Sequence, residues 1–168
     1  PAYIHKLPVV IILFGVIRAA ARLAFKGKAV DFAVMTLGLE PDDFGRAFAM
    51  SGISKQFGSG NPRYVAGMNG CELARLVLVE TGVSFTDADD ALFIEKSPEY
   101  WAGWALAFYQ WYSGFTFAEI LAAMPLDDVI AMHDIYHEMD IMQFVDAMQD
   151  AMREANPQTR LRIRRETC

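Results

Sequence analysis

The chain has 168 residues, with 15 Lys and Arg against 21 Asp and Glu, 54% apolar side chains and two cysteines. This length fits one compact domain, alone or with a fragment of another, and the composition excludes a disordered chain or a disulfide scaffold. The formal net charge of −6 argues against a surface that coats nucleic acid, because phosphate binding depends on surplus basic residues. With glycine counted, the apolar share exceeds that of ordinary domains. We therefore expect some apolar surface to meet a partner, another copy, a membrane or a missing segment.

Residues 1–28 are predicted to form a divergent N-terminal apolar helix. The apolar run Pro8–Gly15 is followed by arginines after too few residues to cross a bilayer, so no membrane span is predicted. We interpret this segment as a packed or self-associating helix, with a membrane-surface helix as the alternative. Cys71 and Cys168 lie far apart and form no spacing pattern, which favours reduced thiols and a cytoplasmic location.

Residues 29–156 are predicted to form an all-α domain, a compact bundle of about six to eight short helices, because no stretch of period-two alternation competes with the helical pattern. Ala29–Leu37 reads as a short apolar helix, and Pro41 opens the next helix, which turns Phe44 and Phe48 inward.

Further along, turn residues and capping residues mark the boundaries. The glycine-rich stretch Phe57–Gly70 is predicted to be the longest irregular segment, and the acidic stretch Val83–Lys96 a solvated connector. Leu126–Glu138 is expected to form another short helix. Three pairs of residues predict reciprocal caps at helix N-termini: Asn69 with Glu72, Thr116 with Glu119, and Asp140 with Gln143.

The segment that starts at Ser97-Pro98 and ends at Gly114 is the densest aromatic helix of the chain. Four aromatic residues repeat on one stripe, and core packing accounts for them better than a ligand cage does: Trp101, Trp104, Phe108 and Trp111. The flanking tyrosines have polar tips suited to a groove for a peptide or a partner helix. The predicted partner-binding residues are Tyr100, Trp104, Tyr109 and Tyr112.

His133 and His137 stand four residues apart, the spacing of two zinc ligands on one helix face, with Asp134 where a zinc protease carries glutamate. Glu138 or Asp140 could complete a site, but no third His or Cys stands out. We therefore interpret the histidines as surface residues and predict neither a metal nor a cofactor. A small metal-dependent hydrolase is the alternative, although no catalytic triad, activated cysteine or paired carboxylates support an enzyme.

The last ten residues, Thr159–Cys168, carry a charge of +3, whereas the preceding 158 residues carry −9. One interpretation is a solvated basic tail, and the other is the start of a nucleic-acid-binding module. In the second case the four arginines contact the DNA backbone or belong to a linker. They are Arg160, Arg162, Arg164 and Arg165.

Three segments, Ser51–Leu78, Ser97–Ile120 and Ile135–Met148, resemble the N-terminal region that precedes a Cro/repressor-type (XRE-like) helix-turn-helix domain in bacterial transcriptional regulators. The last ten residues resemble the start of that domain's first helix, so residues 157–168 are assigned to a basic linker and a truncated DNA-binding domain. The resemblance covers residues 29–168, while residues 1–28 depart from the acidic start of the family.

The resemblance implies a non-enzymatic regulatory or oligomerisation domain. One expectation is that the protein works beside a toxin or mobile-element gene. Its expected partner is another copy of the chain or a second protein. The recognition helix of the DNA-binding domain is not in the sequence, so the chain alone is not expected to read a DNA sequence. DNA would be bound only through that missing domain. The alternatives are the metal-dependent hydrolase and a peptide-binding helical module.

Overall fold

The computed structural model describes residues 27–65, 67–90 and 97–155. Within these ranges the chain is all-α and holds no strand, which confirms the predicted fold class. None of the helices in these ranges combines the length and the apolar character that crossing a membrane requires. The elements are the π-helical turn η1 (Phe32–Thr36), α2 (Pro41–Met50), α3 (Gly52–Gly58), α4 (Pro62–Val65), α5 (Gly70–Thr81), α6 (Pro98–Ser113), α7 (Phe117–Ala123), α8 (Leu126–Ala131), α9 (His133–Tyr136) and α10 (Ile141–Ala155).

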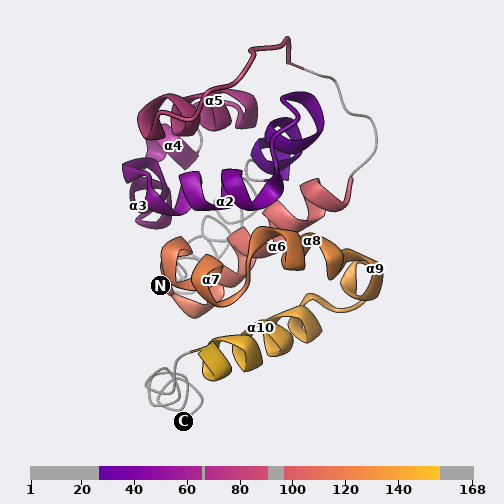
Figure 1. Cartoon of the computed structure of the whole chain (residues 1–168). Helices are drawn as coiled ribbons and strands as arrows, with labels where there is room; N and C mark the ends of the chain where they lie inside the picture. The colour runs from indigo at the N-terminus through magenta and orange to yellow at the C-terminus, as the bar shows by residue number, and fades with distance from the viewer. Residues whose placement is uncertain (1–26, 66, 91–96, 156–168) are drawn as a thin grey trace, which may run out of the picture.

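The helix α2 lies in the middle of the bundle, with α5 on one side and α7 and α8 on the other (Figure 1). The aromatic helix α6 packs against α8 and α9, and α10 closes the end of the bundle against α6, α7 and α9. One hydrophobic core joins these elements. Phe44 and Phe48 of α2 are buried in it, as predicted.

Capping chemistry places two helix starts where the sequence predicts them. Asn69 Oδ1 accepts a hydrogen bond from the Glu72 backbone N–H at 2.9 Å, and Glu72 Oε2 accepts one from the Asn69 backbone N–H at 2.7 Å. Thr116 and Glu119 form the same reciprocal pair at the start of α7, with distances of 3.2 and 2.7 Å. Each pair satisfies two backbone donors that a helix start would otherwise leave free.

The third predicted pair, Asp140 with Gln143, is replaced by a different arrangement. Asp140 Oδ1 accepts a hydrogen bond from the Met142 backbone N–H at 2.8 Å, and the Gln143 N–H bonds to the Asp140 carbonyl oxygen at 2.9 Å. The helix that follows still buries an apolar stripe, with Ile141 only partly covered. Its fully buried members are Phe144, Val145, Met148 and Met152.

Two segments differ from the prediction. One contains more helix than expected, and the other forms two short helices instead of one. The stretch expected to be irregular, Phe57–Gly70, contains the end of α3 and the single turn α4. The stretch expected to form one helix, Leu126–Glu138, is divided into α8 and α9 at Met132. The helix before α2 ends in the π-helical turn η1, after which Gly38 has a φ of 69°.

Candidate functional site

The aromatic helix α6 is fixed at both ends by local chemistry. Ser97 Oγ accepts a hydrogen bond from the Tyr100 backbone N–H at 3.0 Å and donates one to the carboxyl group of Asp31. At the other end Gly114 has a φ of 68°, a left-handed conformation that glycine adopts without steric cost. The helix therefore spans the predicted residues.

The buried face of α6 consists mostly of small side chains. Helices whose contacting side chains are small can approach one another closely, and α8 is one of the helices that α6 contacts. The buried residues of α6 are Ala102, Gly103, Ala105, Leu106, Ala107, Tyr109 and Ser113. Trp111 and Tyr112 are thereby turned toward the surface of the bundle.

This orientation corrects the predicted core stripe. Trp101 does pack inward, because its ring lies 5.4 Å from the ring of the buried Phe144 in an edge-on arrangement. Trp104 and Phe108 are only partly buried, and Trp111 is 52% exposed. Core packing is therefore confirmed for Trp101, Trp104 and Phe108, which pack against the core while only partly buried, and it is wrong for Trp111.

Four of these side chains, Trp104, Phe108, Trp111 and Tyr112, form a continuous series of ring contacts that we call the aromatic row. Phe108 stacks on Trp104 with ring centroids 6.2 Å apart and on Tyr112 with centroids 6.3 Å apart. Its ring also lies 5.8 Å from that of Trp111. The only charged residue in α6 is Glu99 in the first turn, so the aromatic row is an uncharged surface.

The predicted partner-binding residues do not all lie on one surface. Tyr112 is 46% exposed, and Tyr100 and Trp104 are partly exposed. Tyr109 is fully buried, because it lies four and seven residues after Ala105 and Ala102 and shares their face of the helix. The assignment of Tyr109 to a partner surface is therefore wrong. Trp111, absent from that set, could have been found from its spacing of three residues from Phe108.

A cavity of about 310 Å³ lies where the first half of α6 meets α9 and the start of α10. We call it the aromatic cavity, because most of its wall consists of rings. The four largest rings are those of Tyr100, Trp101, Trp104 and Tyr136, and the imidazoles of His133 and His137 complete the wall. Trp104 belongs both to this cavity and to the aromatic row, so the two features are continuous.

The two histidines stack on each other, with ring centroids 4.2 Å apart and planes 12° apart. His137 Nδ1 lies 2.7 Å from the His133 carbonyl oxygen, which places the proton of a neutral ring on Nδ1. Asp134 and Glu138 each lie within 4 Å of one imidazole. Nevertheless, the described residues contain no group of three His, Cys, Asp or Glu side chains that could hold a metal ion.

The remaining predicted site residues lie outside the described ranges. They are Arg160, Arg162, Arg164 and Arg165, the predicted DNA-backbone residues. The N-terminal helix predicted within residues 1–28 also falls almost wholly outside these ranges, as does the basic linker at 157–168.

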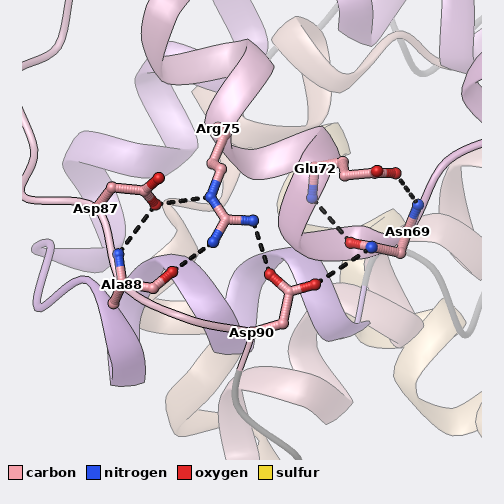
Figure 2. Close-up of polar contacts among 6 residues, drawn as sticks. All are labelled: Asn69, Glu72, Arg75, Asp87, Ala88 and Asp90. Carbon is pink, nitrogen blue, oxygen red and sulfur yellow. Dashed lines mark hydrogen bonds and ion pairs between the residues drawn. The ribbon is translucent and has the colours of Figure 1, made fainter.

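The acidic connector after α5 is held chiefly by Arg75, and Asn69 Nδ2 also donates to Asp90 Oδ2 at 3.3 Å (Figure 2). Arg75 Nε lies 2.7 Å from Asp87 Oδ1 and Arg75 Nη1 lies 2.7 Å from Asp90 Oδ1, while Nη2 donates to the Ala88 carbonyl oxygen. The guanidinium also lies over the ring of Phe32, 4.6 Å from its centroid. Hydrogen bonds from Arg75 hold the pKa values of both carboxyl groups below their usual range. The prediction of a solvated connector thus missed an anchor that fixes this segment on α5.

Asp31 is a buried carboxyl group beside the start of α6. It is 1% exposed, and its Oδ2 finds no hydrogen-bond partner among the described residues. Burial raises the pKa of Asp31, and the negative charge of Glu99 adds to this effect, while the hydrogen bond from Ser97 and the charge of Lys28 act in the opposite direction. This group bears on stability rather than on recognition, because its polar atoms do not reach the surface.

Comparison of the chain with models of protein families, with curated proteins and with solved structures finds no match.

Proposed function

We propose that this chain is a non-enzymatic regulatory and oligomerisation domain of a bacterial Cro/repressor-type regulator, and that two copies associate through the aromatic row of α6. The observation that carries this proposal is the orientation of α6, which buries alanines and exposes Trp111 and Tyr112. The DNA-binding role and the cytoplasmic location are parts of the same proposal and derive from the sequence.

The charge of the molecule favours contact at this surface. The described residues contain six Lys and Arg and nineteen Asp and Glu, a formal net charge of −13. The whole chain carries −6, so the residues outside the described ranges carry +7. Two copies repel each other wherever the acidic surfaces of their described residues meet, and these surfaces also repel the DNA backbone. The aromatic row carries no charge. A two-fold contact there would bring identical uncharged surfaces together, which is the geometry of an isologous dimer.

The size of the aromatic row indicates a weak dimer. Large aromatic side chains bury about 150–250 Å² each, and Trp111 and Tyr112 are each about half exposed. They offer about 200 Å² together, whereas a stable interface takes about 800 Å² from each partner. Tryptophan and tyrosine are nevertheless the side chains that most often dominate interface energies. We therefore expect association in the micromolar to millimolar range.

Sedimentation velocity of the whole chain from about 5 to 500 µM tests the proposal. We expect the sedimentation coefficient to rise with concentration and the rise to disappear in the double variant Trp111→Gln, Tyr112→Gln. Met50→Gln and Val79→Gln serve as matched controls, because both residues are more exposed apolar side chains on other helices, at 73% and 69%. A monomer at every concentration, or equal loss in the controls, would show that the aromatic row is not the interface.

Of the two alternative functions, only one is supported by an observation. A hydrolase built on His133 and His137 gains no support, because the described residues contain no group of three His, Cys, Asp or Glu side chains that could hold a metal ion. A peptide-binding module is favoured by one observation, the aromatic cavity beside Trp104. Substitution of Trp104 by Leu would abolish peptide capture without unfolding the chain if that alternative is correct.

A further inference from the structure

The walls of the aromatic cavity are held in place by ring packing. The buried ring of Phe144 contacts Trp101 at 5.4 Å and Tyr136 at 6.3 Å between centroids, both edge-on. Trp101 in turn contacts the ring of His133 at 5.7 Å. One buried phenylalanine thus braces two of the large rings and, through Trp101, an imidazole. A cavity whose wall is fixed in this way exists before any ligand arrives, which lowers the entropic cost of binding.

Acidic residues outnumber basic ones in the described segments that line the aromatic cavity. Residues 97–152, which supply all of the described lining, include nine Asp and Glu and no Lys or Arg. Two of these acids lie beside the imidazoles: Asp134 Oδ1 is 3.3 Å from His133 Nδ1, and Glu138 Oε1 is 3.7 Å from His137 Nε2. Both carboxylates are exposed, so they lie at the rim of the cavity and not within it. An anionic ligand would be repelled there, and a cation attracted.

The wall itself selects among cations. Ammonium and guanidinium groups with N–H bonds need hydrogen-bond acceptors when they leave water. An aromatic wall offers few acceptors but several π-faces, on which a quaternary ammonium group, having no N–H, is stabilised by cation–π interaction; tryptophan is the best such partner. A volume of about 310 Å³ lies at the lower end of the range of small-molecule pockets. It suits a compact cationic head group better than an extended ligand.

We propose that the aromatic cavity binds a quaternary ammonium group, either of a free small molecule or of a trimethylated lysine. The proposal does not depend on self-association through the aromatic row, because the ligand meets α9 and the start of α10 as well as α6. Tyr100, Trp101, Trp104 and Tyr136 would supply the ring faces, and the carboxylates of Asp134 and Glu138 would attract the charge to the opening.

Calorimetric titration of the whole chain with choline and with its neutral isostere 3,3-dimethylbutan-1-ol tests the proposal. The two molecules share size and shape and differ in charge. We expect choline to bind at least about fivefold more tightly, since a desolvated cation–π contact is worth about one factor of ten. A second arm uses the N-acetyl methylamide of trimethyllysine. Tighter binding of this compound assigns the site to a modified protein, and tighter binding of choline assigns it to a free molecule; both support the proposal.

Matched variants separate the cavity from general effects of substitution. Trp104→Leu is expected to weaken choline binding about tenfold, whereas Trp111→Leu, the same change on the same helix outside the cavity, is expected to leave it unchanged. His137→Lys places a fixed positive charge at the wall and should abolish binding, while His137→Gln should retain it. Circular dichroism checks that each variant is folded. If Trp104→Leu unfolds the chain, the comparison of His137→Lys with His137→Gln takes its place, because these two variants also test whether the cavity recognises a positive charge.

Three results would overturn the proposal: no binding of choline or of the trimethyllysine compound up to 10 mM, equal binding of choline and its neutral isostere, or equal binding by His137→Lys and His137→Gln. The second result would mean that the cavity recognises apolar shape alone. Each of these outcomes leaves self-association through Trp111 and Tyr112 unaffected, because those side chains lie outside the cavity.

Discussion

Replacing the buried carboxyl group of Asp31 by an amide should change how stability depends on pH. The side chain is 1% exposed, accepts a hydrogen bond from Ser97, and has a second oxygen without a partner among the described residues. Its pKa is raised chiefly by burial and further by Glu99, against the opposing effects of Ser97 and Lys28. Asp31→Asn keeps the shape of the protonated form and removes the proton that titrates.

The sign of the effect follows from proton binding in the two states. Above the ordinary carboxyl value of 3.8, the unfolded chain releases the Asp31 proton while the folded chain keeps it. The contribution of Asp31 to the free energy of unfolding must therefore fall as the pH rises from this value, until the folded-state pKa is passed. One proton limits the contribution of Asp31 to about 1.4 kcal/mol per pH unit. The variant lacks this contribution, so its stability relative to the wild type should rise over the same interval and then level off.

Urea unfolding followed by circular dichroism between pH 3 and pH 8 measures both chains, and subtracting one curve from the other cancels the carboxyl groups they share. Asp87→Asn is a control of opposite sign, because Arg75 lowers the pKa of Asp87. That variant should be less stable than the wild type at neutral pH and approach it as the pH falls. A flat difference between Asp31→Asn and wild type across the whole range would refute the assignment of Asp31 as a carboxyl group that stays protonated on folding.

Two further substitutions test other parts of the structure. Arg75→Gln removes both ion pairs and the hydrogen bond to Ala88. Hydrogen–deuterium exchange across residues 84–90 should therefore become faster, while α2 and α7 stay protected. Unchanged exchange would mean that Arg75 does not anchor the segment. Gly114→Ala forces a side chain into a φ of 68° and should lower the free energy of unfolding by about 1–2 kcal/mol in urea titration. Gly58→Ala, at a helical glycine with ordinary van der Waals space, should leave the free energy of unfolding unchanged or raise it slightly. Equal losses in the two variants would show that the φ of Gly114 is not the cause.

Features that depend on a few neighbouring residues could be predicted from the sequence. The caps at Asn69 and Thr116 each need one side chain and the backbone three residues away, so their spacing alone identifies them. The end of α6 at Gly114 can also be predicted from neighbouring residues alone, because it depends on the conformational freedom of glycine. A capping side chain can nevertheless bond to a different backbone group. Asp140 accepts a hydrogen bond from the backbone N–H of Met142 instead of pairing with Gln143.

The buried face of α6 could not be predicted in this way, because the helix is apolar on nearly every side. A periodic pattern identifies the core only when polar residues mark the opposite face, and α6 carries one charged residue, Glu99. The largest side chains were assigned to the core by size. The neighbouring helices instead accept Ala102 and Ala105, since small residues permit a close approach. Packing against the neighbouring helices therefore determines which face of α6 is buried.

The anchor at Arg75 and the aromatic cavity were missed for a related reason. Arg75 lies twelve and fifteen residues from its carboxylates, and the cavity joins Trp101 and Trp104 to a segment about thirty residues further on. No fixed spacing predicts such contacts, because they form only after the helices are placed. The histidine pair was recognised from its spacing of four residues, but its stacking and its place beside Trp101 were not.

The apolar surplus of the sequence and its acidic charge have one structural consequence in common. A helix that only completed the core would gain most by burying Trp111, since a half-exposed tryptophan forgoes burial worth about 25 cal/mol for every square ångström. The chain instead keeps Trp111 and Tyr112 at the surface of a body whose described residues carry a charge of −13. Because charge repulsion opposes contact elsewhere on such a surface, an uncharged aromatic row is where a second copy can approach at the lowest electrostatic cost. The same exposure that weakens the core of one copy is thus what would allow two copies to recognise each other.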